Sequence, residues 1–303
     1  MSARPEARSW EIHLALIGAQ TGFALFPIFG KLALASIGPF PFAAFRVVAA
    51  ATLLEGIRRV GPREEIRRAD RPRIFFYGLL GVSFNQLLFI FGLFFTTAIA
   101  TSILTATIPV FTLAAAVMLG RERMTGRAAA GIVLAGGGAL ALLNAQRFDL
   151  GNTSFRGDLL LLANATSYSL YLVLSRPVLA HYRVATFTAA VFRYGAVFIV
   201  LVALPALRRF EPSRVTSLAW GSLVAVILFC TVFPYLANSW ALARTHASHV
   251  AFYVFLQPLI STVLAILILG EALTKRTLLA AILILAGLGV AVARGRLPAR
   301  PLP

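Results

Sequence analysis

Long apolar stretches, separated by short polar segments, run along the whole chain. A helix needs about 20 mostly apolar residues to cross the hydrocarbon core of a bilayer. Glycine-proline pairs, arginine-rich segments and polar turns divide the sequence into ten stretches of about that length. We expect membrane-spanning helices at 12–35, 40–57, 74–96, 98–119, 127–144, 158–176, 185–207, 216–240, 247–269 and 276–293. At Thr96-Thr97 the sequence also allows one long, bent helix instead of a break.

The second half of the chain repeats a pattern of the first half. Pro109, Glu122, Thr125, Arg127 and Gly138 recur 149 residues later as Pro258, Glu271, Thr274, Arg276 and Gly287, and Phe45-Arg46 recurs 147 residues later as Phe192-Arg193. Each half holds five apolar stretches, an odd number, so the second half would cross the membrane in the opposite direction. Inverted repeats of this kind build a binding site near the bilayer midplane. We therefore expect an all-α polytopic membrane protein, with ten transmembrane helices arranged as two inverted five-helix repeats around a central cavity.

The repeat also divides the chain. The expected parts are an N-terminal cytoplasmic segment at 1–11, a first five-span repeat at 12–144, an inter-repeat loop at 145–157, a second, inverted repeat at 158–293, and a cytoplasmic basic tail at 294–303.

Composition and charge agree with this picture. Hydrophobic residues make up 59% of the chain, charged residues 13%, and the mean hydropathy is +0.84, which is typical of a polytopic membrane protein. The net charge of +17 would suit nucleic acid, but the arginines lie in short segments between apolar stretches. With the N-terminus inside, 18 Lys and Arg residues fall on the cytoplasmic side, 7 on the other side and 3 within stretches. The positive-inside rule then places both termini in the cytoplasm. We expect the protein to contact the lipid bilayer and to bind no nucleic acid.

Polar and aromatic residues inside the stretches are candidates for a cavity wall. Polar side chains in a membrane bundle turn toward its interior, and spacings of three and four residues place 164, 168 and 171, and likewise 249, 253 and 257, on one helical face. Such a cavity would suit a zwitterion with an apolar or aromatic side chain; the alternative is ordinary hydrogen bonding between helices. The candidates are Gln20, Phe23, Asn85, Gln86, Phe89, Asn164, Tyr168, Tyr171, Asn238, His249, Tyr253 and Gln257.

Four prolines lie inside apolar stretches. Each removes a backbone hydrogen bond and bends the helix, and a membrane tolerates such a break only where protein or a wet cavity satisfies it. We interpret Pro27, Pro109, Pro234 and Pro258 as hinges or cavity-shaping kinks, with simple packing kinks as the alternative.

The duplicated charges have two interpretations. Glu122 with Arg127, and Glu271 with Arg276, are expected to form structural ion pairs across a helix turn, or alternatively pairs that rearrange at a gate. Arg46 and Arg193 lie inside stretches, where a cation needs a partner, a wet cavity or a path to the interface; one in each half could bind an anion, or both could snorkel.

No known catalytic or metal-binding pattern is present. The chain has one cysteine, no HExxH and no P-loop, and His246 and His249 alone do not make a transition-metal site. We expect no enzymatic activity, no metal and no cofactor. We place no carboxylate within a stretch except Glu55 near a helix end. The hypothesis is therefore facilitative or weakly coupled transport, and the alternative is a static pore.

These features resemble the drug/metabolite transporter superfamily, specifically its EamA-type ten-span exporters. The resemblance rests on a Pro in the fourth and ninth stretches, Gly-Arg-Glu or Gly-Glu thirteen residues later, a Thr-x-Arg and a glycine-rich helix, together with Ala-Ala-Phe-Arg at 43–46 and Phe29-Gly30-Lys31. It covers 12–293 and is most similar to the YddG-like branch. It implies export of aromatic or large neutral amino acids by alternating access in the bacterial inner membrane. The alternative is proton-coupled export of other metabolites or amphiphilic drugs, and the oligomeric state is open.

Overall fold

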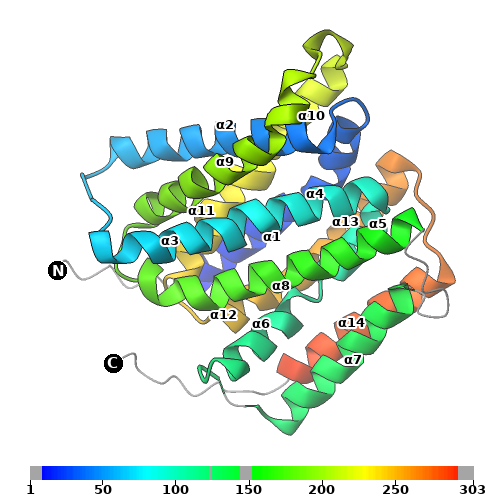
Figure 1. Cartoon of the computed structure of the whole chain (residues 1–303). Coiled ribbons are helices and arrows are strands. Elements are labelled where there is room, and N and C mark those ends of the chain that lie inside the picture. The colour runs from blue at the N-terminus through cyan, green and yellow to red at the C-terminus, as the bar shows by residue number, and fades with distance from the viewer. Residues whose placement is uncertain (1–8, 123, 144–151, 293–303) are drawn as a thin grey trace.

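The computed structural model describes residues 9–122, 124–143 and 152–292. These residues form a bundle of helices that lie side by side (Figure 1). The predicted tail at 294–303, most of the segment 1–11 and the loop 145–157 up to residue 151 lie outside the described residues. The helices are α1 (Ser9–Leu34), α2 (Pro39–Val60), α3 (Arg71–Gly78), α4 (Asn85–Phe95), α5 (Ala98–Thr105), α6 (Ile108–Met118), α7 (Gly126–Leu143), α8 (Thr153–Leu179), α9 (Val184–Arg208), α10 (Ser217–Ile227), α11 (Phe233–Leu242), α12 (Ala247–Phe252), α13 (Leu256–Leu269) and α14 (Lys275–Val292).

Helix ends coincide with residues that start or stop helices. Pro39 opens α2, where its fixed φ suits the first turn and its missing N–H costs nothing. Gly270 ends α13 with a φ of 65°, in the left-handed region that glycine tolerates. The Thr97 side chain caps α5 by accepting the Ala100 N–H. The chain is therefore broken at Thr96-Thr97, and the single long helix that the sequence also allowed is wrong.

Eight helical segments of the described chain are long and apolar enough to cross a membrane. The other two predicted stretches are α7, whose apolar part is shorter, and α14. The segments are Trp10–Leu34, Pro39–Val60, Arg68–Phe95, Ala98–Met118, Thr153–Leu179, Val184–Arg208, Ser217–Leu242 and His249–Leu269.

The small residues of α7 and α14 let these two helices touch along their backbones. A Cβ added to Gly138 would lie 2.9 Å from the Ala280 carbonyl oxygen, and one added to Gly287 would lie 2.6 Å from the Ala135 backbone nitrogen. Glycine at these positions is what permits the close approach. The pair lies at one edge of the bundle (Figure 1).

Four of the predicted spans are interrupted, and the interruptions recur in both halves. The third and eighth contain π-helical turns, Leu79–Phe84 and Leu228–Val232. The fourth breaks between α5 and α6, and the ninth passes through a 3-10 turn at Tyr253–Phe255 between α12 and α13.

Three of the four prolines lie at these interruptions. Pro109, Pro234 and Pro258 each fall in the first turn of the α-helix that follows an interruption, a position where proline is well tolerated. Pro27 differs, because α1 is assigned as one continuous helix through it. A break at Pro27 is therefore not part of this structure, whereas the other three prolines mark real interruptions.

Contacts between helices also recur when the two halves are exchanged. The equivalent helices α2 and α9 pack on each other, as do α7 and α14. The contact of α8 with α4 is matched by that of α1 with α11, and the contact of α8 with α6 by that of α1 with α13. α1 starts at the end of the bundle where the N-terminus lies, whereas α8 ends there (Figure 1).

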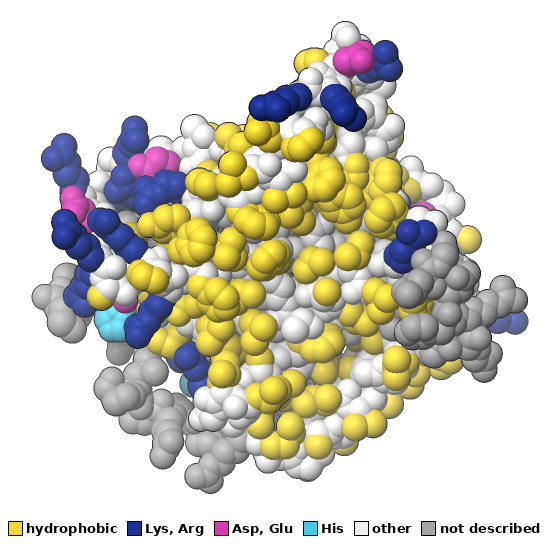
Figure 2. All heavy atoms as spheres, in the orientation of Figure 1, with side chains coloured by type: hydrophobic (Ala, Val, Ile, Leu, Met, Phe, Trp, Pro, Cys, Tyr) yellow, Lys and Arg dark blue, Asp and Glu magenta, His cyan; other side chains and the backbone are white. Residues whose placement is uncertain are grey.

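Charge lies at the ends of the bundle. Figure 2 shows apolar side chains across the middle of the visible face, Lys and Arg gathered at the N-terminal end, and fewer at the opposite end. Exposed apolar side chains of the described chain include Leu201, Val224 and Phe229. Such a belt fits a protein surrounded by lipid.

Candidate functional site

A small cavity lies in the interior of the bundle, between the two halves of the chain. Its volume is about 50 Å³, enough for a few water molecules. Side chains from both halves line it: Phe23, Phe26, Arg46, Asn85, Gln86, Phe89, Thr105, Ile108, Asn164, Tyr168, Tyr235 and Gln257. Seven of the twelve candidates from the sequence are among them, namely Phe23, Asn85, Gln86, Phe89, Asn164, Tyr168 and Gln257.

The helix interruptions surround this cavity. Asn85 directly follows the first π-helical turn, Ile108 follows the break between α5 and α6, and Gln257 follows the 3-10 turn. Tyr235 follows the second π-helical turn. Irregular backbone at membrane depth is tolerated where it lines a cavity or is buried in protein, and here it presents side chains to one place.

One wall is held by a chain of amide and hydroxyl groups from four helices. Gln257 Nε2 donates to Gln20 Oε1 at 2.6 Å, Gln20 Nε2 donates to Asn238 Oδ1 at 3.4 Å, and Asn238 Nδ2 donates to the Tyr168 hydroxyl at 3.0 Å. Gln20 and Asn238 do not line the cavity themselves. They lie in the wall and position the lining residues Gln257 and Tyr168.

A second network orients other lining residues. Arg46 Nη1 donates to Gln86 Oε1, and Arg46 Nε donates to Thr231 Oγ1 at 2.7 Å. Gln86 Nε2 donates to the Tyr235 hydroxyl at 2.9 Å, which lies 3.1 Å from Asn85 Oδ1. The amide and phenol groups on this side therefore have fixed orientations.

Three further candidates lie outside the cavity. Tyr171 is stacked on Tyr168, with ring centroids 5.8 Å apart, and packs behind it against the Gly81 backbone. His249 and Tyr253 form a ring cluster with His13 of α1, in which His13 Nδ1 and the Tyr253 hydroxyl are hydrogen-bonded. This cluster packs the N-terminal part of α1 against α12 and the 3-10 turn that follows it. Residues 249 and 253 therefore do not line this small cavity with 257, and their part in a substrate site stays a prediction.

Five of the lining residues are not among the twelve candidates from the sequence: Phe26, Arg46, Thr105, Ile108 and Tyr235. The repeat could have identified Ile108 as a lining residue, because Ile108 occupies the position equivalent to Gln257. Arg46 is 1% exposed and does not snorkel, whereas the equivalent Arg193 is exposed.

Glu271 has different partners from those expected. Its carboxylate accepts the backbone N–H groups of Ala98 at 2.7 Å and Ile99 at 2.9 Å, at the start of α5. Arg276, its expected partner, donates to the Ala141 carbonyl at 2.8 Å instead. The first turn of a helix has free N–H groups and a positive dipole end, which attract a carboxylate. The pairing of Glu122 with Arg127 stays a prediction.

The two ends of the bundle carry equivalent basic contacts. In the last turns of α1, Lys31 Nζ donates to the Thr96 carbonyl. Near the end of α8, Arg176 Nε donates to the Thr245 carbonyl at 2.7 Å. Lys31 and Arg176 each lie three residues before the end of their helix, and Thr96 and Thr245 are 149 residues apart, the spacing of the repeat. We call these contacts the two latches, because each ties the end of α1 or α8 to the residues that precede α5 or α12.

The latch at Arg176 affects a nearby histidine. Burial lowers the pKa of His246, the residue before α12, and the Arg176 guanidinium lowers it further, although Glu122 acts in the opposite direction. The imidazole is therefore neutral at neutral pH.

A buried carboxylate lies inside α8. The predicted sixth span began at Asp158, but Asn152 caps the helix and α8 begins at Thr153, so Asp158 lies inside it. Asp158 is 7% exposed, and its Oδ1 atom has no hydrogen-bond partner among the described residues. The Thr96 side chain and the Arg276 guanidinium lie near it. This placement corrects the expectation that carboxylates are missing from the spans.

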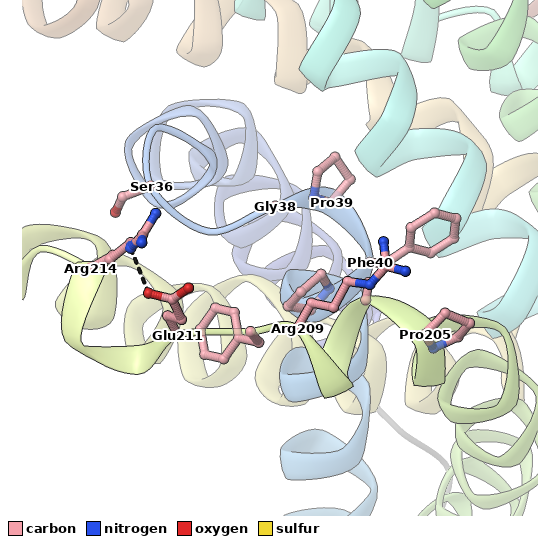
Figure 3. Close-up of a pocket in the computed structure, with 11 residues that line it drawn as sticks. Ser36, Gly38, Pro39, Phe40, Pro205, Arg209, Glu211 and Arg214 are labelled. Carbon is pink, nitrogen blue, oxygen red and sulfur yellow. Dashed lines mark ion pairs between the residues drawn. The ribbon is translucent and has the colours of Figure 1, made fainter.

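Two larger hollows lie at the ends of the bundle. One, of about 590 Å³, lies between the start of α2 and the end of α9, where Arg214 and Glu211 form an ion pair at 2.5 Å (Figure 3). The other, of about 440 Å³, lies beside Glu55, Glu64 and Arg193. Both are lined by loops and helix ends, in contrast to the central cavity.

Comparison with known proteins identifies the family. The sequence model of the EamA-like transporter family matches residues 10–144 and 155–293. An uncharacterized transporter of Archaeoglobus fulgidus is 26% identical and covers 94% of this chain and 99% of its own length. A WAT1-related protein of Arabidopsis thaliana is 24% identical over 96% of this chain and 87% of its own. One crystal structure superimposes on this chain with a TM-score of 0.69 at 18% sequence identity. The match covers 94% of this chain and 98% of the other, so the two proteins share a fold. With the two family matches together spanning most of the sequence, the chain belongs to the EamA-like transporter family and is a membrane transporter.

Proposed function

We propose that this transporter exports a small metabolite across a bacterial inner membrane, with aromatic or large neutral amino acids as substrates. One observation carries the proposal: the rings of Phe23, Phe89 and Tyr168 face the same space as the amides of Asn164 and Gln257. Rings suit an apolar side chain, and amides suit a polar head group.

The transport mode is alternating access. Ligand sites usually measure about 300–1,000 Å³, and the cavity of about 50 Å³ is much smaller. A substrate therefore needs the surrounding helices to move apart. Ten crossings in two inverted repeats, 12–144 and 158–293, would provide this movement by rocking one set of helices against the other. The recurring contacts, interruptions and family matches support the repeats.

The two latches are the gates. Lys31 holds α1 to the start of α5 at one end of the bundle, and Arg176 holds α8 to the start of α12 at the other. Both latches are formed in this structure, which agrees with the small cavity. In each transport cycle one latch would open while the other stays closed.

The test of this function is counterflow into liposomes that contain the purified protein. The liposomes are preloaded with an unlabelled amino acid and challenged with the same labelled compound outside. We expect exchange that is selective for phenylalanine, tryptophan or large neutral amino acids, and Tyr168→Ala should slow it. No exchange with any amino acid would contradict the substrate assignment.

Asp158 favours a second candidate, proton-coupled transport. The hypothesis of facilitative transport depends on the absence of carboxylates inside the spans. Asp158 is buried inside α8, so this argument no longer holds. A buried carboxyl with a free oxygen atom is a suitable proton carrier. An imposed pH gradient alone should then drive substrate accumulation in the wild type but not in Asp158→Asn. No accumulation in the wild type would leave facilitative transport as the mode, and equal accumulation in both proteins would contradict a proton-carrying role of Asp158.

A further inference from the structure

Among the residues that the structure describes, Arg46 is the one charged side chain that lines the central cavity. Its guanidinium carbon lies 3.8 Å from the centre of the Phe26 ring, and two of its nitrogen atoms donate to Gln86 and Thr231. The Thr231 hydroxyl donates to the Val226 carbonyl, with the two oxygen atoms 2.7 Å apart. The hydroxyl oxygen can therefore accept the hydrogen bond from Arg46. Neutral groups therefore fix the position of a buried cation.

No carboxylate balances this charge within the part of the chain that the structure describes. The ion pairs there join Glu55 to Arg58 and Arg59, and Asp70 and Glu211 to nearby surface arginines. The described residues that line the cavity include no aspartate or glutamate. A buried ion without a partner is unfavourable, and a planar guanidinium is well suited to a carboxylate. An anion that enters the cavity would supply the missing charge.

We infer that Arg46 binds the carboxylate of the transported molecule, and that the site takes aromatic or apolar carboxylates whether or not they carry an amino group. This inference rests on the proposed function and narrows its substrate class. Phe23, Phe26 and Phe89 form an apolar side of the same space. An ammonium group would meet only neutral acceptors there and the like charge of Arg46. Recognition therefore depends on the acid group and not on the amine.

The first experiment compares three small probes that share a phenyl ring. L-Phenylalanine carries both charged groups, 3-phenylpropionate only the carboxylate, and phenethylamine only the amine. The measurement is the shift in thermal unfolding of the purified full-length protein in detergent. We expect stabilisation by phenylalanine and 3-phenylpropionate and none by phenethylamine. Stabilisation by the amine, or by neither acid, would overturn the inference.

Variants separate the role of Arg46 from its effect on folding. Arg46→Gln should weaken 3-phenylpropionate binding about tenfold to a hundredfold, the range expected for a lost charge-assisted hydrogen bond. Arg193→Gln, at the equivalent but exposed position, should bind as the wild type does. Gln86→Glu keeps Arg46 and gives it a carboxylate partner, so it should abolish binding and raise the unfolding temperature. Unchanged binding in Arg46→Gln or in Gln86→Glu would contradict the inference.

The outcomes also distinguish this inference from the proposed function. Exchange of phenylalanine without competition from 3-phenylpropionate would support the amino-acid exporter and contradict carboxylate recognition through Arg46 alone. Arg46-dependent binding of 3-phenylpropionate without exchange of any amino acid would support the carboxylate site and contradict the amino-acid assignment.

Discussion

Arg46 and Arg193 occupy equivalent positions in the two halves and have opposite surroundings. Arg46 is buried against Phe26, whereas Arg193 is exposed beside a hollow that Glu55 and Glu64 also line. The scaffold is thus nearly symmetric while the cavity is not. A single cation on one wall gives a bound molecule one preferred orientation, which two equivalent arginines would not.

His249 and Tyr253 show why a regular spacing does not by itself place side chains at one cavity. A regular helix would place residues 249, 253 and 257 on one face, but the 3-10 turn at Tyr253–Phe255 changes that alignment. Residues 249 and 257 are also about 12 Å apart along a helix, too far for both to reach a small cavity. The four-residue spacing was visible in the sequence, but the local change in helix type was not.

At the residue scale, Glu271 is predicted to stabilise the protein through the start of α5. Glu271→Ala removes both acceptors of the Ala98 and Ile99 N–H groups. Loss of a helix cap costs about 0.5–2 kcal/mol, so we expect a lower unfolding temperature in detergent. The control is Glu211→Ala, which removes only an exposed ion pair with Arg214 and should have little effect. Equal effects of the two variants would contradict the capping role.

At the scale of elements, the sequence predicted the apolar spans well and their interior irregularities less well. Apolar stretches and Gly-Pro pairs are local signals, and they placed most helices within a few residues. Proline marked three of the interruptions correctly. The π-helical turn at Leu79–Phe84 has no proline and depends on packing: Ser83 Oγ donates to the Gly195 carbonyl of α9 at 3.1 Å. A contact between distant segments cannot be read from the local pattern.

The close packing of α1 on the second π-helical turn gives an element-scale prediction. A Cβ added to Gly22 would lie 2.4 Å from the Phe229 carbonyl oxygen and 2.6 Å from the Pro234 ring. Gly22→Ala should therefore push α1 away from α11 and lower the unfolding temperature. Gly56→Ala is the control, because a Cβ there meets nothing within 4 Å, and alanine favours a helix by about 1 kcal/mol over glycine. A Gly22→Ala protein as stable as the control would contradict the close packing of α1.

At the scale of the whole molecule, side chains from both halves line a small central cavity, and the latch contacts of Lys31 and Arg176 lie at the two ends of the bundle. The sequence predicted the duplication because five residues recur at constant spacing. It could not predict that both latches are formed, because the choice between open and closed states depends on small differences in packing. The equivalent contacts of Lys31 and Arg176 became visible only when the helix ends were placed in space.

If the latches are gates, substitutions at Lys31 and at Arg176 should have opposite effects on access to the cavity. Lys31→Ala should favour opening at the end of the bundle where α5 begins, and Arg176→Ala should favour opening at the N-terminal end. Opening at one end should reduce access from the other, because the two gates share one cavity. A static pore would instead gain access at one end and lose none at the other.

The measurement that tests this account most directly is maleimide labelling of Thr105→Cys, a cavity-lining position, with the buried Cys230 replaced by alanine. A membrane-impermeant maleimide is added to either face of reconstituted vesicles of known orientation. We predict slow labelling from both faces in the parent protein. Lys31→Ala should speed labelling from the face where α5 begins and slow it from the other, and Arg176→Ala should do the reverse. Labelling from only one face in all three proteins, or faster labelling from one face without a loss at the other, would contradict alternating access through this cavity.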